Sequence, residues 1–213
     1  MDSNDEVKSW HGETITAATE ETLIVLRNST ILGDAYLAGG TGLALQFGHR
    51  RSLDLDFFVR ELFDEDGLLQ RIQVLPGFAL VAKSPHTLHA TIHETKVSFL
   101  GYVYPLLFPA APFLGVPVAD TRDIACMKMS AIASRGSKRD FVDLYEACRR
   151  FDLADLLNLF ARKFAATRYN RIHLLKSLVY FADAEKDPLP HMLTPLDWAE
   201  VKRFFLREVP GFM

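Results

Sequence analysis

Two short motifs in the first third of the chain combine residue types that hold phosphates and metal ions. Gly39-Gly40-Thr41 follows a short apolar run, and Asp54-Leu-Asp56 comes twelve residues later. Adjacent glycines let backbone amides approach an anion closely, and the N-terminus of a following helix adds partial positive charge. Alternate residues of a strand share a face, so the two carboxylates would converge, which is costly unless a cation lies between them. Hard oxygen ligands favour Mg²⁺ or Mn²⁺.

The residues around the aspartate pair sharpen this hypothesis. The alternative is an exposed strand with two solvated acids, and the apolar neighbours in Leu53–Phe58 argue against it. Arg50, Arg51 and Ser52 precede the pair and could contact phosphate, although a solvated loop is equally consistent with them. His89 and His93 would lie roughly 13 Å apart along one strand face, too far to share a zinc ion.

A second group of candidates lies in the C-terminal half. Lys128 belongs to an almost wholly apolar helix, so its amine must reach solvent or meet an anion such as a triphosphate, Asp140 or Asp143. Asp140 and Asp143 lie three residues apart on one helix face, where Arg139 could pair with Asp143. Asp140 could instead complement the helix dipole. Cys126 is expected to be a small core residue rather than a nucleophile.

The motifs together resemble a known enzyme family. The order of the motifs resembles the signature of the polymerase-β-like nucleotidyltransferase superfamily, in which Gly-Gly-Thr is followed after twelve residues by Asp-x-Asp. The strings YLAGGTGLALQFGHRRSLDLDFF and KMSAIASRGSKRDFVDLYEA resemble its AbiEii/AbiGii toxin family, over residues 35–149. The resemblance implies Mg²⁺- or Mn²⁺-dependent transfer of a nucleoside monophosphate from an NTP to an acceptor hydroxyl. It also implies an antitoxin partner and, for some relatives, a tRNA acceptor end.

The resemblance assigns roles residue by residue. Gly40 and Thr41 would hold the phosphates of the nucleotide, with Thr41 replacing the usual serine. Gly39, Arg51 and Ser52, which adjoin the two motifs, are further candidates for nucleotide binding. Catalytic roles fall on Asp54, Asp56, Lys128, Asp140 and Asp143, of which Asp54 and Asp56 would bind the metal.

One position departs from the superfamily. Many members carry a third carboxylate on a later strand, but the candidate strand here, Lys96–Leu100, has Ser98 at its centre. Glu94 lies only at the strand's entry. Asp140 or Asp143 could supply the third acid, catalysis could use two carboxylates, or activity could be lost.

The elements that must position these residues follow from periodicity. Residues 1–119 read as an α/β core and residues 120–213 as a helical part packed on it, contributing Lys128 and Asp143. We expect an α+β fold, with a mixed sheet, flanking helices and a C-terminal helical bundle. The predicted strands are Ala35–Ala38, Ser52–Val59, Phe78–Lys83, Thr87–His93, Lys96–Tyr102 and Val116–Val118. The predicted helices are Glu20–Arg27, Gly42–Phe47 (capped by Thr41), Asp64–Val74, Asp120–Ser134, Lys138–Arg149, Leu153–Ala165, Arg171–Ala182 and Pro195–Leu206.

Composition excludes several classes. The chain is 49% hydrophobic and 24% charged, which excludes a disordered protein. Val97–Ala119 has no charged residue, but its four prolines exclude a membrane helix, so we expect a strand and a proline-rich loop. Two cysteines provide no disulfide framework. We therefore expect a soluble cytoplasmic protein.

Charge is distributed unevenly. The net charge is -3, yet residues 122–176 hold 12 basic and 6 acidic side chains. This window favours an RNA partner, and solvated helix faces are the alternative. The expected phosphate contacts are Arg149, Arg150, Arg162, Lys163, Arg168 and Arg171. Two other functions stay open: modification of a small molecule or a protein hydroxyl, and a catalytically inactive nucleotide- or RNA-binding module.

Overall fold

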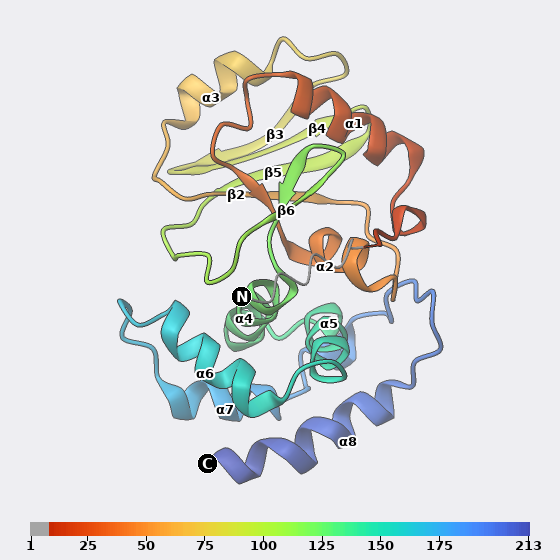
Figure 1. Ribbon diagram of the computed structural model, residues 1–213, viewed down its shortest axis with the longest axis vertical. Helices are drawn as coiled ribbons and strands as arrows, with labels where there is room; N and C mark the ends of the chain where they lie inside the picture. The colour runs from red at the N-terminus through yellow and green to blue at the C-terminus, as the bar shows by residue number, and fades with distance from the viewer. Residues whose placement is uncertain (1–8) are drawn as a thin grey trace, which may run out of the picture.

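A seven-stranded mixed sheet lies at the centre of the computed structural model, which describes residues 9–213 (Figure 1). The strand order is β3-β4-β5-β2-β1-β7-β6. The pairs β2/β5 and β1/β7 are parallel, and the others are antiparallel. The strands are β1 (Tyr36–Leu37), β2 (Leu55–Val59), β3 (Ala79–Ser84), β4 (Thr87–Ile92), β5 (Thr95–Gly101), β6 (Ala111–Phe113) and β7 (Val116–Val118).

Helices cover the sheet unequally. Figure 1 shows α1 and α3 above the sheet, while α4 to α8 form the lower half of the molecule. No helix within residues 9–213 is both long and apolar enough to cross a membrane. The helices are α1 (Ala17–Asn28), α2 (Gly39–Phe47), α3 (Glu65–Ile72), α4 (Thr121–Ser134), α5 (Lys138–Cys148), α6 (Leu153–Lys163), α7 (Arg171–Leu178) and α8 (Trp198–Glu208).

The α+β architecture is the one that the sequence predicts, with local differences. Helix α7 ends at Leu178 rather than Ala182, and α8 begins at Trp198 rather than Pro195. The proline-rich segment contains an extra strand, β6, which pairs with β7 across a two-residue turn. Leu114 and Gly115 both have positive φ there, as a type I′ hairpin turn requires. Helix α2 begins at Gly39, so Thr41 lies inside it and is not its N-cap. Strand β2 begins at Leu55, and Leu53 before it is exposed.

Three apolar clusters hold the layers together. One joins α1 and α3 to the sheet, with members such as Leu23 and Phe57. A second is formed by the C-terminal helices around Phe141 and Leu156. A small third cluster, which includes Met127, links β1 and α2 to α4. Burying large apolar side chains contributes about 1.5–3 kcal/mol each, so these clusters fix the helical layer against the sheet.

A buried ion pair fastens the β5–β6 loop to the helices. Lys163 on α6 and Asp123 on α4 are fully buried, with Nζ 2.7 Å from Oδ1. Lys163 also donates to the Pro105 carbonyl, and Asp123 accepts the backbone amides of Leu107 and Phe108. Each charge therefore has partners, as burial demands.

Candidate active site

A cavity of about 550 Å³ opens between the sheet and helices α4 and α5. One wall is the sheet face formed by β2, β5 and β4. The opposite wall comes from α4, α5 and the turn between them. Of the residues that sequence reasoning selected as candidates for the site, the cavity is lined by Gly39, Gly40, Arg50, Ser52, Asp54, Asp56, Lys128 and Asp140. Thr41, Arg51 and Asp143 are not among the lining residues.

The aspartate pair lies where β2 begins. Asp54 immediately precedes β2 and Asp56 is its second residue, so both side chains leave the strand on the cavity side, while Leu55 between them is buried. Burial raises the pKa of Asp56; the charge of Lys128 opposes this rise and the charge of Asp54 adds to it. Within residues 9–213 the one ion pair of Asp54 is with Arg139, whose Nη1 lies 4.0 Å away.

The turn formed by Gly39 and Gly40 lies close to the aspartate pair. Gly39 has φ +62°, and a Cβ there would come within 2.7 Å of Asp56 Oδ2. A Cβ on Gly40 would meet Arg50 Nη2. The positive φ at Gly39 therefore favours glycine, and a side chain at Gly40 would displace the Arg50 guanidinium. The buried Thr41 hydroxyl donates to the Asp54 carbonyl and lies 2.9 Å from Ser52 Oγ, so it fastens the helix to the aspartate segment.

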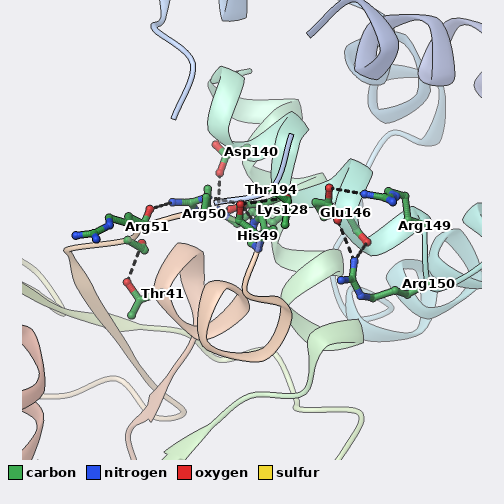
Figure 2. Close-up of polar contacts among 12 residues, drawn as sticks. Thr41, His49, Arg50, Arg51, Lys128, Asp140, Glu146, Arg149, Arg150 and Thr194 are labelled. Carbon is green, nitrogen blue, oxygen red and sulfur yellow. Dashed lines mark hydrogen bonds and ion pairs between the residues drawn. The ribbon is translucent and has the colours of Figure 1, made fainter. Parts of the chain in front are cut away.

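Asp143 is the centre of a buried charge network rather than part of the cavity wall. Arg50 donates two hydrogen bonds to its carboxylate, from Nε to Oδ1 at 2.6 Å and from Nη2 to Oδ2 at 2.8 Å. His49 Nε2 lies 2.9 Å from Oδ1, and Lys128 Nζ lies 2.6 Å from Oδ2. Figure 2 shows His49, Arg50 and Lys128 gathered where the loop after α2 meets the helices. Burial alone would raise the pKa of Asp143, but the charges of Arg50 and Lys128 hold it well below its usual range.

Lys128 links this network to Asp140. Its Nζ lies 2.9 Å from Asp140 Oδ1, and Asp140 also accepts hydrogen bonds from Arg135 Nε at 2.8 Å and Ser137 Oγ at 2.6 Å. Burial would raise the pKa of Asp140, and Lys128 and Arg135 together lower it far below its ordinary value. The expected pairing of Arg139 with Asp143 is wrong, because Arg139 is exposed and faces Asp54.

The basic window does not form one solvated surface. Lys163 is fully buried against Asp123, so the expectation that it contacts phosphate is wrong. Arg149 and Arg150 both pair with Glu146, farther along α5 from the cavity (Figure 2). The remaining expected contacts, Arg162, Arg168 and Arg171, are exposed.

Strand register brings together two residues that sequence reasoning did not join. Ser98 on β5 pairs with Asp56 on one side and His89 on the other. His89 Nδ1 lies 3.0 Å from Ser98 Oγ, and both side chains line the cavity. The sequence signal that could have indicated this contact is the alternation of side chains along β4 and β5, which places His89 and Ser98 on the same face of the sheet. Cys126 is buried as expected, and burial raises its pKa to about 12.

Asp54 and Asp56 fit a hard divalent cation. They present oxygen donors on one cavity wall, and the raised pKa of Asp56 shows that its negative charge is poorly compensated. The described residues offer no group of three or more acidic, histidine or cysteine side chains that could hold a metal. A cation here would therefore complete its shell with water or substrate oxygens, as Mg²⁺ commonly does.

The comparison with protein families defines the class of the protein as a nucleotidyltransferase. The family model described as "Nucleotidyl transferase AbiEii toxin, Type IV TA system" matches residues 90–212, and the chain belongs to this family. The match includes Lys128, Asp140 and Asp143 and begins after the glycine and aspartate motifs. It also extends through the helices beyond residue 149.

The chain is also similar to one curated protein in sequence and to solved structures in fold. An uncharacterized protein of Aquifex aeolicus is 40% identical over 189 residues, covering 86% of this chain and 90% of its own length. The nucleotidyltransferase toxin MenT4 of Mycobacterium tuberculosis is similar in fold, with a TM-score of 0.53, 18% identity and coverage of 92% of this chain and 86% of its own. JHP933 of Helicobacter pylori has a TM-score of 0.51 and 20% identity, covering 93% and 92%.

Proposed function

We propose that the protein transfers a nucleoside monophosphate from an NTP to an RNA hydroxyl, with a divalent metal held by Asp54 and Asp56. The observation that carries the proposal is the cavity itself, in which two carboxylates on the sheet face cationic side chains on α4 and α5. Bound Mg²⁺ or Mn²⁺ would neutralise phosphate charge and lower the pKa of the acceptor hydroxyl.

The chain's own residues would bind and orient the triphosphate. Gly39 and Gly40 expose backbone next to Asp56 and Arg50, where a side chain would clash. Lys128 Nζ has two carboxylate partners, which leaves one of its three protons for a phosphate oxygen. Arg139 is close to Asp54 and half exposed, so it can swing to an incoming phosphate.

Asp143 acts in this proposal as a positioning residue. Its oxygens are occupied by Arg50, His49 and Lys128, so it does not reach an acceptor. It fixes the direction of Arg50 and Lys128, both of which line the cavity. Asp140 does the same for Lys128 and Arg135.

Labelling tests the proposal. The purified protein is incubated with each α-phosphate-labelled NTP, Mg²⁺ or Mn²⁺, and total RNA. We expect labelled RNA with one or more NTPs, no labelling in the presence of EDTA, and loss of labelling in Asp54→Asn and Asp56→Asn. Asp34→Asn, an exposed acid of the same type, serves as the control. Labelling that persists in both site variants would exclude this cavity as the site.

The RNA acceptor has its own test. Binding of RNA should weaken as salt increases, with a linear log–log dependence. Replacing Arg162, Arg168 and Arg171 with glutamine should lower the slope, because each phosphate contact adds about 0.7–0.9 to it. A flat salt dependence would contradict an RNA partner. A product screen with small molecules and proteins in place of RNA would then identify the alternative acceptor.

A toxin paired with an antitoxin is the biological role that the family description supports. Induction of the wild type in a host that lacks the antitoxin should arrest growth, and induction of Asp56→Asn should not. Equal growth of the two strains would contradict a toxic activity at this site.

A further inference from the structure

A row of polar side chains runs across the sheet beside the aspartate pair. Asp56 on β2, Ser98 on β5 and His89 on β4 are successive register partners. Neighbouring strands lie about 4.8 Å apart, so the row spans about 10 Å of the cavity floor. Ser98 stands at the strand position where an acid was expected. The next group along the row is an imidazole, which can accept a proton as a carboxylate can.

The hydrogen bonds along the row fix how the imidazole is protonated. Ser98 is the register partner of Asp56 and helps to lower its pKa, which orients the hydroxyl proton toward Asp56 because a carboxylate can only accept. Ser98 Oγ must then accept from His89 Nδ1, which is 3.0 Å away. The proton of a neutral His89 therefore sits on Nδ1, and Nε2 keeps its lone pair. Nε2 makes no hydrogen bond with any residue of the described chain, 9–213.

The surroundings of His89 suit a substrate better than a structural partner. The ring is half-buried and lines the cavity. The charged side chains that share the cavity come from every element around it. The acids are Asp54, Asp56 and Asp140, and the bases are Arg50, Lys96, Lys128, Arg135 and Arg139. Several of these bases are already paired with carboxylates. His89 Nε2, in contrast, is an acceptor that lines the cavity and has no partner among the described residues.

We propose that His89 is a catalytic residue that accepts the proton of the acceptor hydroxyl, with Ser98 and Asp56 holding its reactive tautomer. This inference rests on the proposed function. The acceptor O–H bond breaks, and its proton moves to His89 Nε2. The acceptor oxygen bonds to the α-phosphorus of the NTP, the bond from that phosphorus to the bridging oxygen breaks, and pyrophosphate leaves. The positive charge of protonated His89 is stabilised through Ser98 by Asp56.

Three variants test the role. His89→Gln retains a polar side chain without a base, Ser98→Ala removes the group that fixes the tautomer, and His191→Gln is an exposed histidine control. The assay uses the NTP that labels RNA with the wild type. General base catalysis contributes about 10²–10⁴-fold, so kcat of His89→Gln should fall by at least about 100-fold. Calorimetric affinity for the same Mg²⁺–NTP should stay within about twofold, because His89 does not hold the triphosphate.

Two readouts separate catalysis from a structural role. The acidic limb of the wild-type pH–rate profile should disappear in His89→Gln, and imidazole should restore part of the rate in His89→Ala. Nitrogen NMR of the free protein should show the Nδ1-protonated tautomer of His89, and Ser98→Ala should abolish that preference. This NMR measurement does not depend on turnover.

The outcomes distinguish the inference from the proposed function. The inference alone is overturned if the wild type labels RNA and Asp56→Asn does not, while His89→Gln works at the wild-type rate. It is equally overturned if NMR finds the proton of neutral His89 on Nε2. A wild type that labels no acceptor overturns the proposed function and the inference together. Loss of NTP binding in His89→Gln would show a structural role and also contradict the inference.

Discussion

Removing the Asp143 carboxylate should destabilise the fold strongly. Asp143→Asn keeps the size of the side chain but leaves Arg50 and Lys128 buried without their shared counter-ion. Breaking a buried pair from one side costs about 3–5 kcal/mol, because the remaining charge is uncompensated. A domain of this size shifts its melting temperature by about 2–4 °C per kcal/mol, so Tm should fall by about 6–20 °C.

Circular dichroism on heating and in urea measures this effect. The control is Asp183→Asn, which breaks an exposed pair with Lys186 and should change stability by less than about 1 kcal/mol. The double variant Arg50→Gln/Asp143→Asn should be more stable than the sum of the single variants predicts, because removing Arg50 relieves the stranded charge. A Tm change under about 2 °C for Asp143→Asn, or strict additivity, would refute the reasoning.

The pH dependence has a definite sign. The pKa of Asp143 is lower in the folded state than in the unfolded state. The ionised carboxylate therefore contributes its full stabilisation of the fold above the unfolded-state pKa of about 4. It is lost as pH falls toward the folded value. The Tm difference between wild type and Asp143→Asn should therefore be constant from pH 8 to about pH 5 and shrink only at lower pH. A difference that disappears near neutrality would contradict the assignment to Asp143.

Three further predictions concern other sites. Lys163→Met leaves Asp123 buried without its cation, so the amides of the β5–β6 loop should exchange faster, by hydrogen exchange, and stability should fall by about 3–5 kcal/mol. Gly39→Ala should abolish Mg²⁺–NTP binding in calorimetry, because a Cβ meets the aspartate pair and φ is +62°. Burial raises the pKa of Cys126 and Cys148 to about 12, so neither thiol should react with iodoacetamide at pH 8 until urea unfolds the protein.

Local periodicity was sufficient to predict most of the architecture. The alternation around Asp56 correctly predicted a strand with one buried and one cavity face, and the change of period after residue 119 predicted the helices. Pro112 obscured strand β6, because proline removes a backbone donor and reads as loop, whereas Val116–Val118 was predicted as a strand despite Pro117. Pro112 lies in the edge strand β6, where proline is tolerated, and Pro117 lies opposite it in the next strand, β7.

The sequence predicted only part of the charge pairing: Asp140 and Asp143 were expected as possible partners of Lys128, and both pair with it. Arg50 and Asp143 are 93 residues apart, and nothing in either local segment indicates that the two side chains form a buried ion pair. Lys163 looked like a solvated helix residue for the same reason, since its partner lies on another helix. The Ser98–His89 contact depends on strand register, which follows from three-dimensional pairing rather than from spacing along the chain.

The two walls of the cavity are also separated in time. Asp54 leaves the ribosome's catalytic centre 74 residues before Lys128 does. At about 5–20 residues per second, a nascent chain carries Asp54 for about 4–15 s before Lys128 is added. The interval between the synthesis of Arg50 and that of its partner Asp143 is longer still, because 93 residues separate them. A ribosome arrested within that interval would hold a chain with the aspartate pair and without the facing wall of α4 and α5, so the cavity can close only after synthesis has passed α5.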